Sequence, residues 1–143
     1  MDMQALTVPA RLDQLVEMRR YVQAVGKQAG LPEDATYKLA LAVDELATNI
    51  VLHGYQEHGL SGDIILSAVT EDEAMSIIME DRGAAFDPAT RPMPSAEELN
   101  KPLEERRIGG LGIFLALNSV DDFSYQRLGE VNRNTLTMKR GKA

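Results

Sequence analysis

The chain has 143 residues, no cysteine and a formal net charge of −7 from 22 acidic and 15 basic side chains. This length predicts a single domain over residues 1–143, and the lack of cysteine excludes disulfides, thiolate metal sites and cysteine nucleophiles. The negative charge would repel nucleic acid and anionic lipid, and neither a secretory signal nor a run of ~18 apolar residues is present, so we expect a cytoplasmic protein without nucleic-acid or membrane partners.

The first half of the chain predicts a strand, two helices and a hairpin. "QALTVPA" (4–10) predicts a short strand, and apolar spacing from Arg11 predicts a helix that glycines at 26–30 interrupt. Pro32 opens a second helix, which we expect to run to about His53 and to be closed by Gly54. "GDIILSAV" (62–69) and "AMSIIME" (74–80) then predict two strands joined by the acidic turn "TEDE".

The second half predicts a long loop, a helix and another hairpin. Residues 88–108, "PATRPMPSAEELNKPLEERRI", hold four of the six prolines, which indicates either a ligand-covering lid or a disordered linker. Glycines then open a third helix, "LGIFLALNSV" (111–120), and "DDFSYQRL" (121–128) and "NTLTMKR" (134–140) flank the turn "GEVN". This order predicts an α+β two-layer sandwich, with helices on one face of a mixed, mostly antiparallel sheet.

A polar stripe follows the second predicted helix. Glu45, Asn49 and His53 lie four residues apart among apolar neighbours, within an arc of roughly 80° on a helical wheel. An amide oxygen suits Mg²⁺, and a carboxylate one turn away could deprotonate an attacking hydroxyl or water. The alternative is a set of exposed or locally hydrogen-bonded side chains. A zinc site is discounted, because one helix does not supply enough nitrogen or sulfur ligands.

Two further segments suggest a nucleotide. In "EDRGAAFDP" (80–88), Asp81 could accept a hydrogen bond from an exocyclic amine, with Gly83 allowing a flat ligand to approach, although Asp-x-Gly after a strand is also an ordinary turn. In "IGGLGIF" (108–114), glycines lead into a helix N-terminus that favours phosphate, although such starts also occur without a ligand. Neither the Rossmann nor the Walker A arrangement is present.

Taken in order, these motifs resemble the ATP-binding domain of gyrases, histidine kinases and mismatch-repair ATPases, which has the Bergerat fold. "ELATNIVLHG" resembles its N box, "EDRGAAFDP" its first glycine box and "GGLGIFLA" its second, and the resemblance covers about residues 10–140. The sequence is most similar to the small stand-alone members, the anti-sigma-factor serine kinases of bacteria. These proteins regulate sigma factors by switching partners with an anti-sigma-factor antagonist.

The resemblance implies a role for each motif residue. Glu45 would be the general base toward a serine of the antagonist, and Asn49 would bind Mg²⁺, with His53 in a supporting role. Asp81 and Gly83 would bind the adenine of ATP. The implied phosphate-binding residues, beneath the lid at 88–108, are Gly109, Gly110, Leu111 and Gly112, with Arg106 and Arg107 as either phosphate ligands or solvated charges.

The resemblance also implies partners. We expect the antagonist protein, a sigma factor and a second copy of the chain in a homodimer, with Arg19 and Arg20 either touching a partner or simply solvated. Two other functions fit the same motifs. One is a non-catalytic module that uses ATP only to order a partner-binding surface, and the other is a detached histidine-kinase catalytic domain.

Overall fold

The computed structural model describes residues 4–85 and 116–140. The strands are β1 (Leu6–Pro9), β2 (Asp63–Thr70), β3 (Ala74–Asp81), β4 (Asp122–Leu128) and β5 (Val131–Lys139). The helical segments are η1 (Leu12–Gln14), α1 (Leu15–Gln28), α2 (Glu33–Asn49), η2 (Ile50–Tyr55) and η3 (Gln56–His58). Residues 116–119 are also helical.

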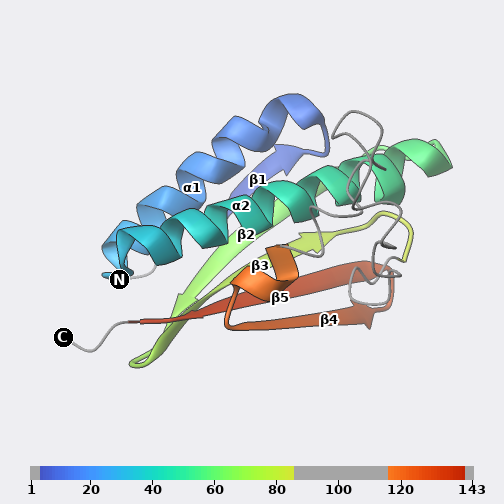
Figure 1. The fold of residues 1–143 in the computed structure, drawn as a ribbon. Coiled ribbons are helices and arrows are strands. Elements are labelled where there is room, and N and C mark those ends of the chain that lie inside the picture. The colour runs from blue at the N-terminus through green and yellow to red at the C-terminus, as the bar shows by residue number, and fades with distance from the viewer. Residues whose placement is uncertain (1–3, 86–115, 141–143) are drawn as a thin grey trace, which may run out of the picture.

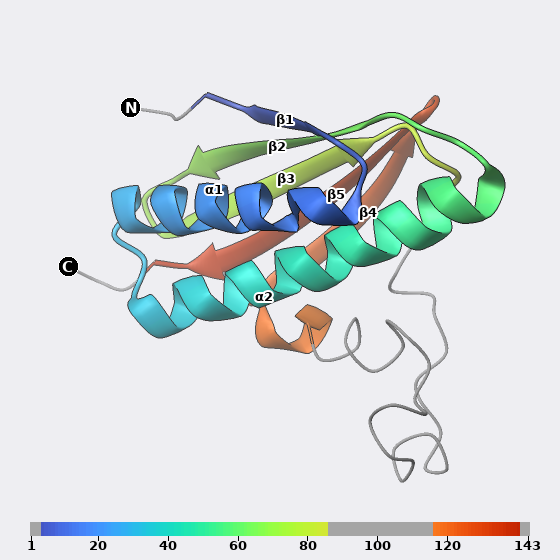
Figure 2. The ribbon, with the colours of Figure 1, turned by 90° about the horizontal axis from the view of Figure 1, so that it is seen from above.

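The strands form one open sheet in the order β1-β2-β3-β5-β4. Figures 1 and 2 show α1 and α2 side by side across one face of this sheet. The predicted α+β two-layer sandwich is therefore confirmed, with one refinement. Each neighbouring pair is antiparallel, so the described sheet is antiparallel throughout and not mixed.

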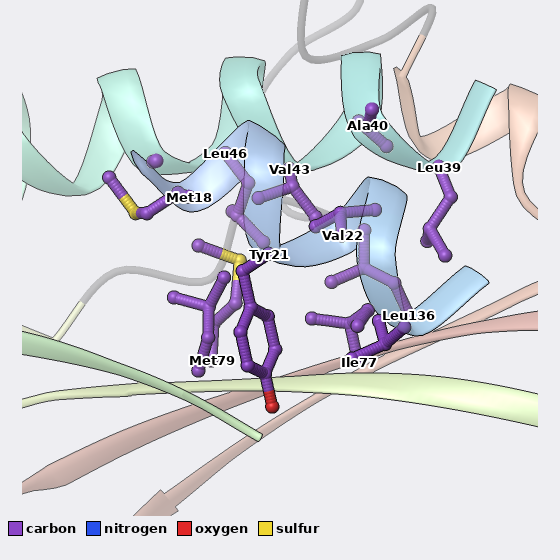
Figure 3. Close-up of a cluster of buried hydrophobic side chains, with 14 of the residues drawn as sticks. Met18, Tyr21, Val22, Leu39, Ala40, Val43, Leu46, Ile77, Met79 and Leu136 are labelled. Carbon is purple, nitrogen blue, oxygen red and sulfur yellow. The ribbon is translucent and has the colours of Figure 1, made fainter. Parts of the chain in front are cut away.

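The core lies between the two helices and the sheet (Figure 3). From α1, Met18, Tyr21, Val22 and Val25 are buried, at the three- and four-residue spacing of a single helix face. From α2, the buried residues include Leu39, Val43 and Leu46, and they face Ile77, Met79 and Leu136 of the strands. No helix in the described ranges is long and apolar enough to cross a membrane.

The inner face of the sheet changes from apolar to polar along the strands. Residues on it alternate with outward-facing ones, as the strand period of two requires. The register pairs Ile77 with Leu136, then Met79 with Asn134, then Asp81 with Asn132. Since Asp81, Asn132 and Asn134 are all buried, one end of an otherwise apolar layer is built from polar side chains.

The end of the second helix differs from the prediction. The α-helix ends at Asn49, but the chain continues through the π-helical turn η2 and the 3-10 turn η3. Gly54 lies inside η2 and does not stop the helix; Gly59, with φ +64°, is where the helical path ends. Because a π-helical turn closes over five residues and not four, His53 does not continue the straight stripe that a regular helix would give.

Tyr55 joins this helical end to the sheet. Its hydroxyl donates to the carbonyl oxygen of Asp63 at 3.0 Å, and accepts from the amide of Arg82 at 2.8 Å. These two contacts connect η2 to the start of β2 and to the residue after β3. Gly62 leaves room for the ring, because a Cβ there would lie 2.9 Å from the Tyr55 ring.

We predict that Tyr55→Phe lowers the free energy of unfolding by about 1–3 kcal/mol, because it leaves an amide and a carbonyl without their partner. Tyr37→Phe is the matched control, since the Tyr37 side chain is 65% exposed, and should change stability by less than about 0.5 kcal/mol. Urea unfolding of the two variants measures this. Equal stability of both would show that the Tyr55 hydroxyl does not hold η2 in place.

Candidate functional site

Asn49 is the last residue of α2 and is 1% exposed. Its Nδ2 donates to the backbone carbonyl of Glu45, one turn earlier, at 2.8 Å. This bond fixes the amide orientation and leaves Oδ1 buried without a hydrogen-bond partner among the described residues. Buried polar atoms are rarely left unsatisfied, so an orphaned amide oxygen at this position points to a missing ligand.

Glu45 is half-buried one turn before Asn49. Burial raises the pKa of its carboxyl, and the neighbouring charge of Asp44 raises this pKa further. Asp44 itself accepts hydrogen bonds from Nη2 and Nε of Arg19, at 2.7 and 3.0 Å, which joins α2 to α1. A carboxyl with a raised pKa is a better proton acceptor at neutral pH than an ordinary one.

His53 is held by Glu57 within the π-helical segment and the turn after it. Its Nδ1 lies 2.6 Å from Oε1 of Glu57, and the His53 side chain is only 18% exposed. A carboxylate on one ring nitrogen fixes the ring orientation and favours a proton at that nitrogen. His53 therefore follows Asn49 along the same helical path, but it lies in the π-helical turn η2 and contacts a different partner, Glu57.

Asp81 ends β3 and is 4% exposed. Its Oδ1 accepts from the amide of Gly83 and from Nδ2 of Asn132, both at 2.9 Å, whereas its Oδ2 is buried without a partner in the described part of the chain. Burial raises the pKa of Asp81; the bonds from Asn132 and Gly83 and the charge of Arg127 oppose this rise. The carboxyl thus presents one free acceptor atom.

Gly83 brings the predicted N box and first glycine box together. A Cβ at Gly83 would lie 2.7 Å from the carbonyl oxygen of Gly54, closer than packed atoms can approach. The amide of Ala84 donates to that same carbonyl at 2.8 Å. Figures 1 and 2 show η2 and the C-terminal end of β3 at the same end of the molecule. The structure therefore places the N-box segment against the Asp81-x-Gly83 segment.

The sequence analysis missed Asn132 and Asn134. Both lie on β5, on the inner face of the sheet, and Oδ1 of Asn134 is buried without a partner among the residues described. "GEVN" was predicted to be a turn, but β5 begins at Val131, and only Gly129 and Glu130 connect it to β4. Asn132 and Asn134 continue the every-second-residue pattern of Leu136 and Met138, which was the signal that could have placed them inside.

The remaining predicted residues divide into two groups. Arg19 and Arg20 form ion pairs with Asp44 and Glu17 within the chain, and contact of these arginines with a partner stays a prediction. The proposed lid and the proposed phosphate-binding residues lie outside the described ranges and stay predictions; these are residues 88–108, Arg106, Arg107, Gly109, Gly110, Leu111 and Gly112.

Five buried side-chain oxygens have no partner among the described residues. Two are the hydroxyl of Tyr21 and Oδ1 of Asp44; the other three are Oδ1 of Asn49 on α2, Oδ2 of Asp81 on β3 and Oδ1 of Asn134 on β5. An oxygen of this kind can accept from a ligand N–H or bind a hard cation. Together, the oxygens of Asn49, Asp81 and Asn134 suit a ligand that carries both an amine and a metal-bound anion.

Residues 8–140 match the family model of the histidine kinase-like ATPase domain. The serine-protein kinase RsbW of Halalkalibacterium halodurans is 34% identical over 118 residues, which cover 82% of this chain and 70% of that protein.

Two solved structures share the fold. The RsbU and RsbW domains of a Mycobacterium tuberculosis protein align with a TM-score of 0.64 and 17% identity, over 99% of this chain and 34% of that longer one. The SiaB-SiaC complex of Pseudomonas aeruginosa aligns with a TM-score of 0.55 and 12% identity, over 96% of this chain and 90% of the matched one. On the family match and the 34% identity, the chain belongs to the histidine kinase-like ATPase domain family, among the serine-protein kinases of the RsbW type.

Proposed function

We propose that this chain is an anti-sigma-factor kinase that uses Mg-ATP to phosphorylate a serine on an anti-sigma-factor antagonist protein. The observation that carries the proposal is the set of buried oxygens of Asn49, Asp81 and Asn134 that no described residue contacts, at the end of the molecule where η2 meets the loop after β3. Similarity to serine-protein kinases supports this reading over a detached histidine-kinase domain.

Asp81 would recognise adenine. Its Oδ1 is occupied by two donors, so Oδ2 is the atom that would accept from the exocyclic amine. Guanine carries a carbonyl oxygen where adenine carries this amine, and would place an acceptor against an acceptor. Asn134 lies on the same sheet face, two register pairs along, and its Oδ1 would provide a further acceptor near the base.

Asn49 would hold Mg²⁺ through Oδ1. The described residues contain no group of three His, Cys, Asp or Glu side chains that could bind a metal by themselves, so a cation here would take most of its ligands from phosphate oxygens and water. That is the usual pattern for Mg²⁺ in phosphoryl-transfer sites. Bound Mg²⁺ would neutralise charge on the phosphates, for which the motif resemblance predicts Arg107, Gly109, Gly110, Leu111 and Gly112 as further ligands.

Glu45 would act on the protein substrate. In the proposed step, the serine oxygen forms a bond to the γ-phosphorus, the bond to the bridging oxygen breaks with release of ADP, and Glu45 accepts the serine proton. Phosphoryl transfer depends mainly on positioning and charge neutralisation. Glu45 would therefore contribute to turnover and little to nucleotide affinity. The antagonist is the proposed substrate, with a sigma factor and a second copy of the chain as further proposed partners.

The first prediction concerns Asn49. We expect Mg-ATP to bind wild type with micromolar affinity in calorimetric titration, and Asn49→Ala to weaken this binding strongly because the cation loses its side-chain ligand. Thr48→Ala is the matched control. Thr48 donates the same kind of side-chain bond to the carbonyl four residues earlier, but it has no role in the proposed binding. Equal binding by Asn49→Ala and wild type, or no binding by either, would contradict the assignment.

The second prediction separates a kinase from a non-catalytic module. Glu45→Gln should bind Mg-ATP with nearly unchanged affinity but transfer phosphate from labelled ATP to candidate antagonist proteins about 10²–10⁴-fold more slowly. Transfer by wild type to a serine of an antagonist is the supporting result. If wild type binds Mg-ATP and transfers phosphate to no antagonist, the nucleotide serves only to order a partner surface.

The third prediction is that one substitution at Asp81 raises the stability of the ligand-free protein and lowers its affinity for Mg-ATP. Asp81→Asn keeps the Oδ1 acceptor and removes a buried charge, so the ligand-free variant should unfold at a higher temperature than wild type at pH 7. An amide donor then replaces Oδ2 and opposes the adenine amine, so affinity for Mg-ATP should fall roughly tenfold or more.

Wild type should also show the pH dependence of a carboxyl whose pKa is raised on folding. The native state holds its proton to higher pH than the unfolded state, so stability falls as pH rises from the ordinary value of 3.8 through the raised pKa. Asp122→Asn, on the exposed strand β4, is the control for Asp81→Asn. It should change neither the unfolding temperature nor the affinity for Mg-ATP. Destabilisation of ligand-free Asp81→Asn would show that the buried charge does not oppose folding.

A further inference from the structure

Asn132 lies at the centre of a buried hydrogen-bond network around Asp81. Its Nδ2 lies 2.9 Å from Oδ1 of Asp81, 3.2 Å from the carbonyl oxygen of Gly83 and 3.1 Å from that of Ala84. Its Oδ1 accepts from the hydroxyl of Tyr125 at 2.5 Å and from Nη1 of Arg127 at 3.1 Å. One side chain therefore contacts the end of β3, the loop after it and the edge strand β4.

The orientation of the Asn132 amide is fixed by these contacts. A flipped amide would place its NH₂ group against two donors, Tyr125 and Arg127, and its oxygen against two carbonyls and a carboxylate. The contacts with Arg127, with the two carbonyls and with the carboxylate would become repulsive, whereas the Tyr125 hydroxyl could turn to accept. Asn132 is 2% exposed, so water cannot readily compensate. Only one orientation is compatible with the surroundings, and it directs both amide hydrogens toward Asp81 and its loop.

Arg127 strengthens the network from the edge strand. The same Nη1 that contacts Asn132 also donates to the carbonyl oxygen of Gly83 at 3.0 Å. The loop after β3 is thus held from two sides, by η2 through Gly54 and by β4 and β5 through Arg127 and Asn132. Because Gly83 also donates to Asp81, the carboxylate and its loop are positioned as one unit.

We propose that Asn132 is a specificity-determining positioning residue: together with Gly83 it occupies Oδ1 of Asp81, and so leaves Oδ2 as the carboxylate atom that selects a purine with an exocyclic amine. This inference rests on the proposed function, in which Asp81 receives adenine. It adds that recognition depends on a residue of β5 that acts through Asp81, together with Arg127 and Tyr125 of β4.

The network also opposes protonation of the buried carboxylate. Burial raises the pKa of Asp81, while the Asn132 bond, the Gly83 bond and the Arg127 charge lower it. Among the described residues, Arg127 from β4 acts on Asp81, and Asp81 in turn acts on Tyr55 of η2; Glu80 and Arg133 form an ion pair on the opposite face. Since only the carboxylate accepts the amine fully, adenine affinity should fall as pH drops through this pKa.

The test compares Mg-ATP with the Mg complex of purine riboside triphosphate, which lacks the exocyclic amine. Wild type should prefer ATP by roughly tenfold or more, the size of one hydrogen bond to a charged group. Asn132→Leu should reduce this preference severalfold at neutral pH, without abolishing it, while leaving analogue affinity within about threefold. A pH series should show ATP affinity of Asn132→Leu declining at higher pH than that of wild type, because the carboxyl has lost a stabilising donor.

Arg133→Leu is the matched control, because Arg133 is the next residue of β5, faces the other way and bonds Glu80 instead of Asp81. It should keep the full preference for ATP. Arg127→Met on the exposed edge strand provides a second variant in case Asn132→Leu does not fold, and should reduce the preference in part and shift the pH profile in the same direction.

The outcomes are separable. A wild type that binds both nucleotides equally would overturn the adenine assignment of the proposed function. A wild type that prefers ATP, with Asn132→Leu and Arg127→Met retaining the same preference and the same pH profile, would overturn the present inference alone. Equal weakening of ATP and analogue by Asn132→Leu would show a structural role only, and would also overturn it.

Discussion

The carbonyl oxygen of Gly54 accepts a hydrogen bond from the amide of Ala84 at 2.8 Å. The preceding residue, Gly83, lies so close to the same carbonyl that it has no room for a Cβ. This close approach joins two segments that are thirty residues apart in the chain. Asn49 precedes it on one side and Asp81 on the other, so their separation is fixed by backbone contact and not by flexible side chains. Catalytic and binding groups need this kind of rigid support to be held in a productive arrangement.

Apolar packing in the sheet offsets the free-energy cost of burying the polar side chains of the site. Between β3 and β5, apolar pairs such as Ile77 with Leu136 give way to Met79 with Asn134 and then to Asp81 with Asn132. Burying an unpaired polar atom costs free energy, and burying a carboxylate costs more. The apolar pairs and the two helices packed on them stabilise the layer, which tolerates polar residues at one end. The site is thus a local departure from core packing, confined to one edge of a continuous core.

Much of the fold could be predicted because apolar periodicity reports burial directly. The positions of Met79 and Leu136 follow from strand alternation, and the helix faces from spacing. The predicted end of the second helix was wrong because Gly54 was taken as a stop signal. In the structure, the carbonyl of Gly54 instead accepts a hydrogen bond from Ala84. Asn132 was missed for a similar reason, since asparagine after glycine suggests a turn. In both cases a tertiary contact between distant segments outweighed a local preference.

The described side chains of the site mostly present oxygen acceptors: Glu45, Asn49, Asp81 and Asn134. Such a surface suits an amine and a cation, but it repels the phosphates of a nucleotide unless a metal ion is present. Within the proposed function, nucleotide and Mg²⁺ must therefore bind together, with Asn49 joining the cation to the protein. Donors for the phosphates have to come from elsewhere. The motif resemblance predicts that Arg107 and the glycines that follow it supply these donors, because the acceptor-lined face built on α2 and β3 does not.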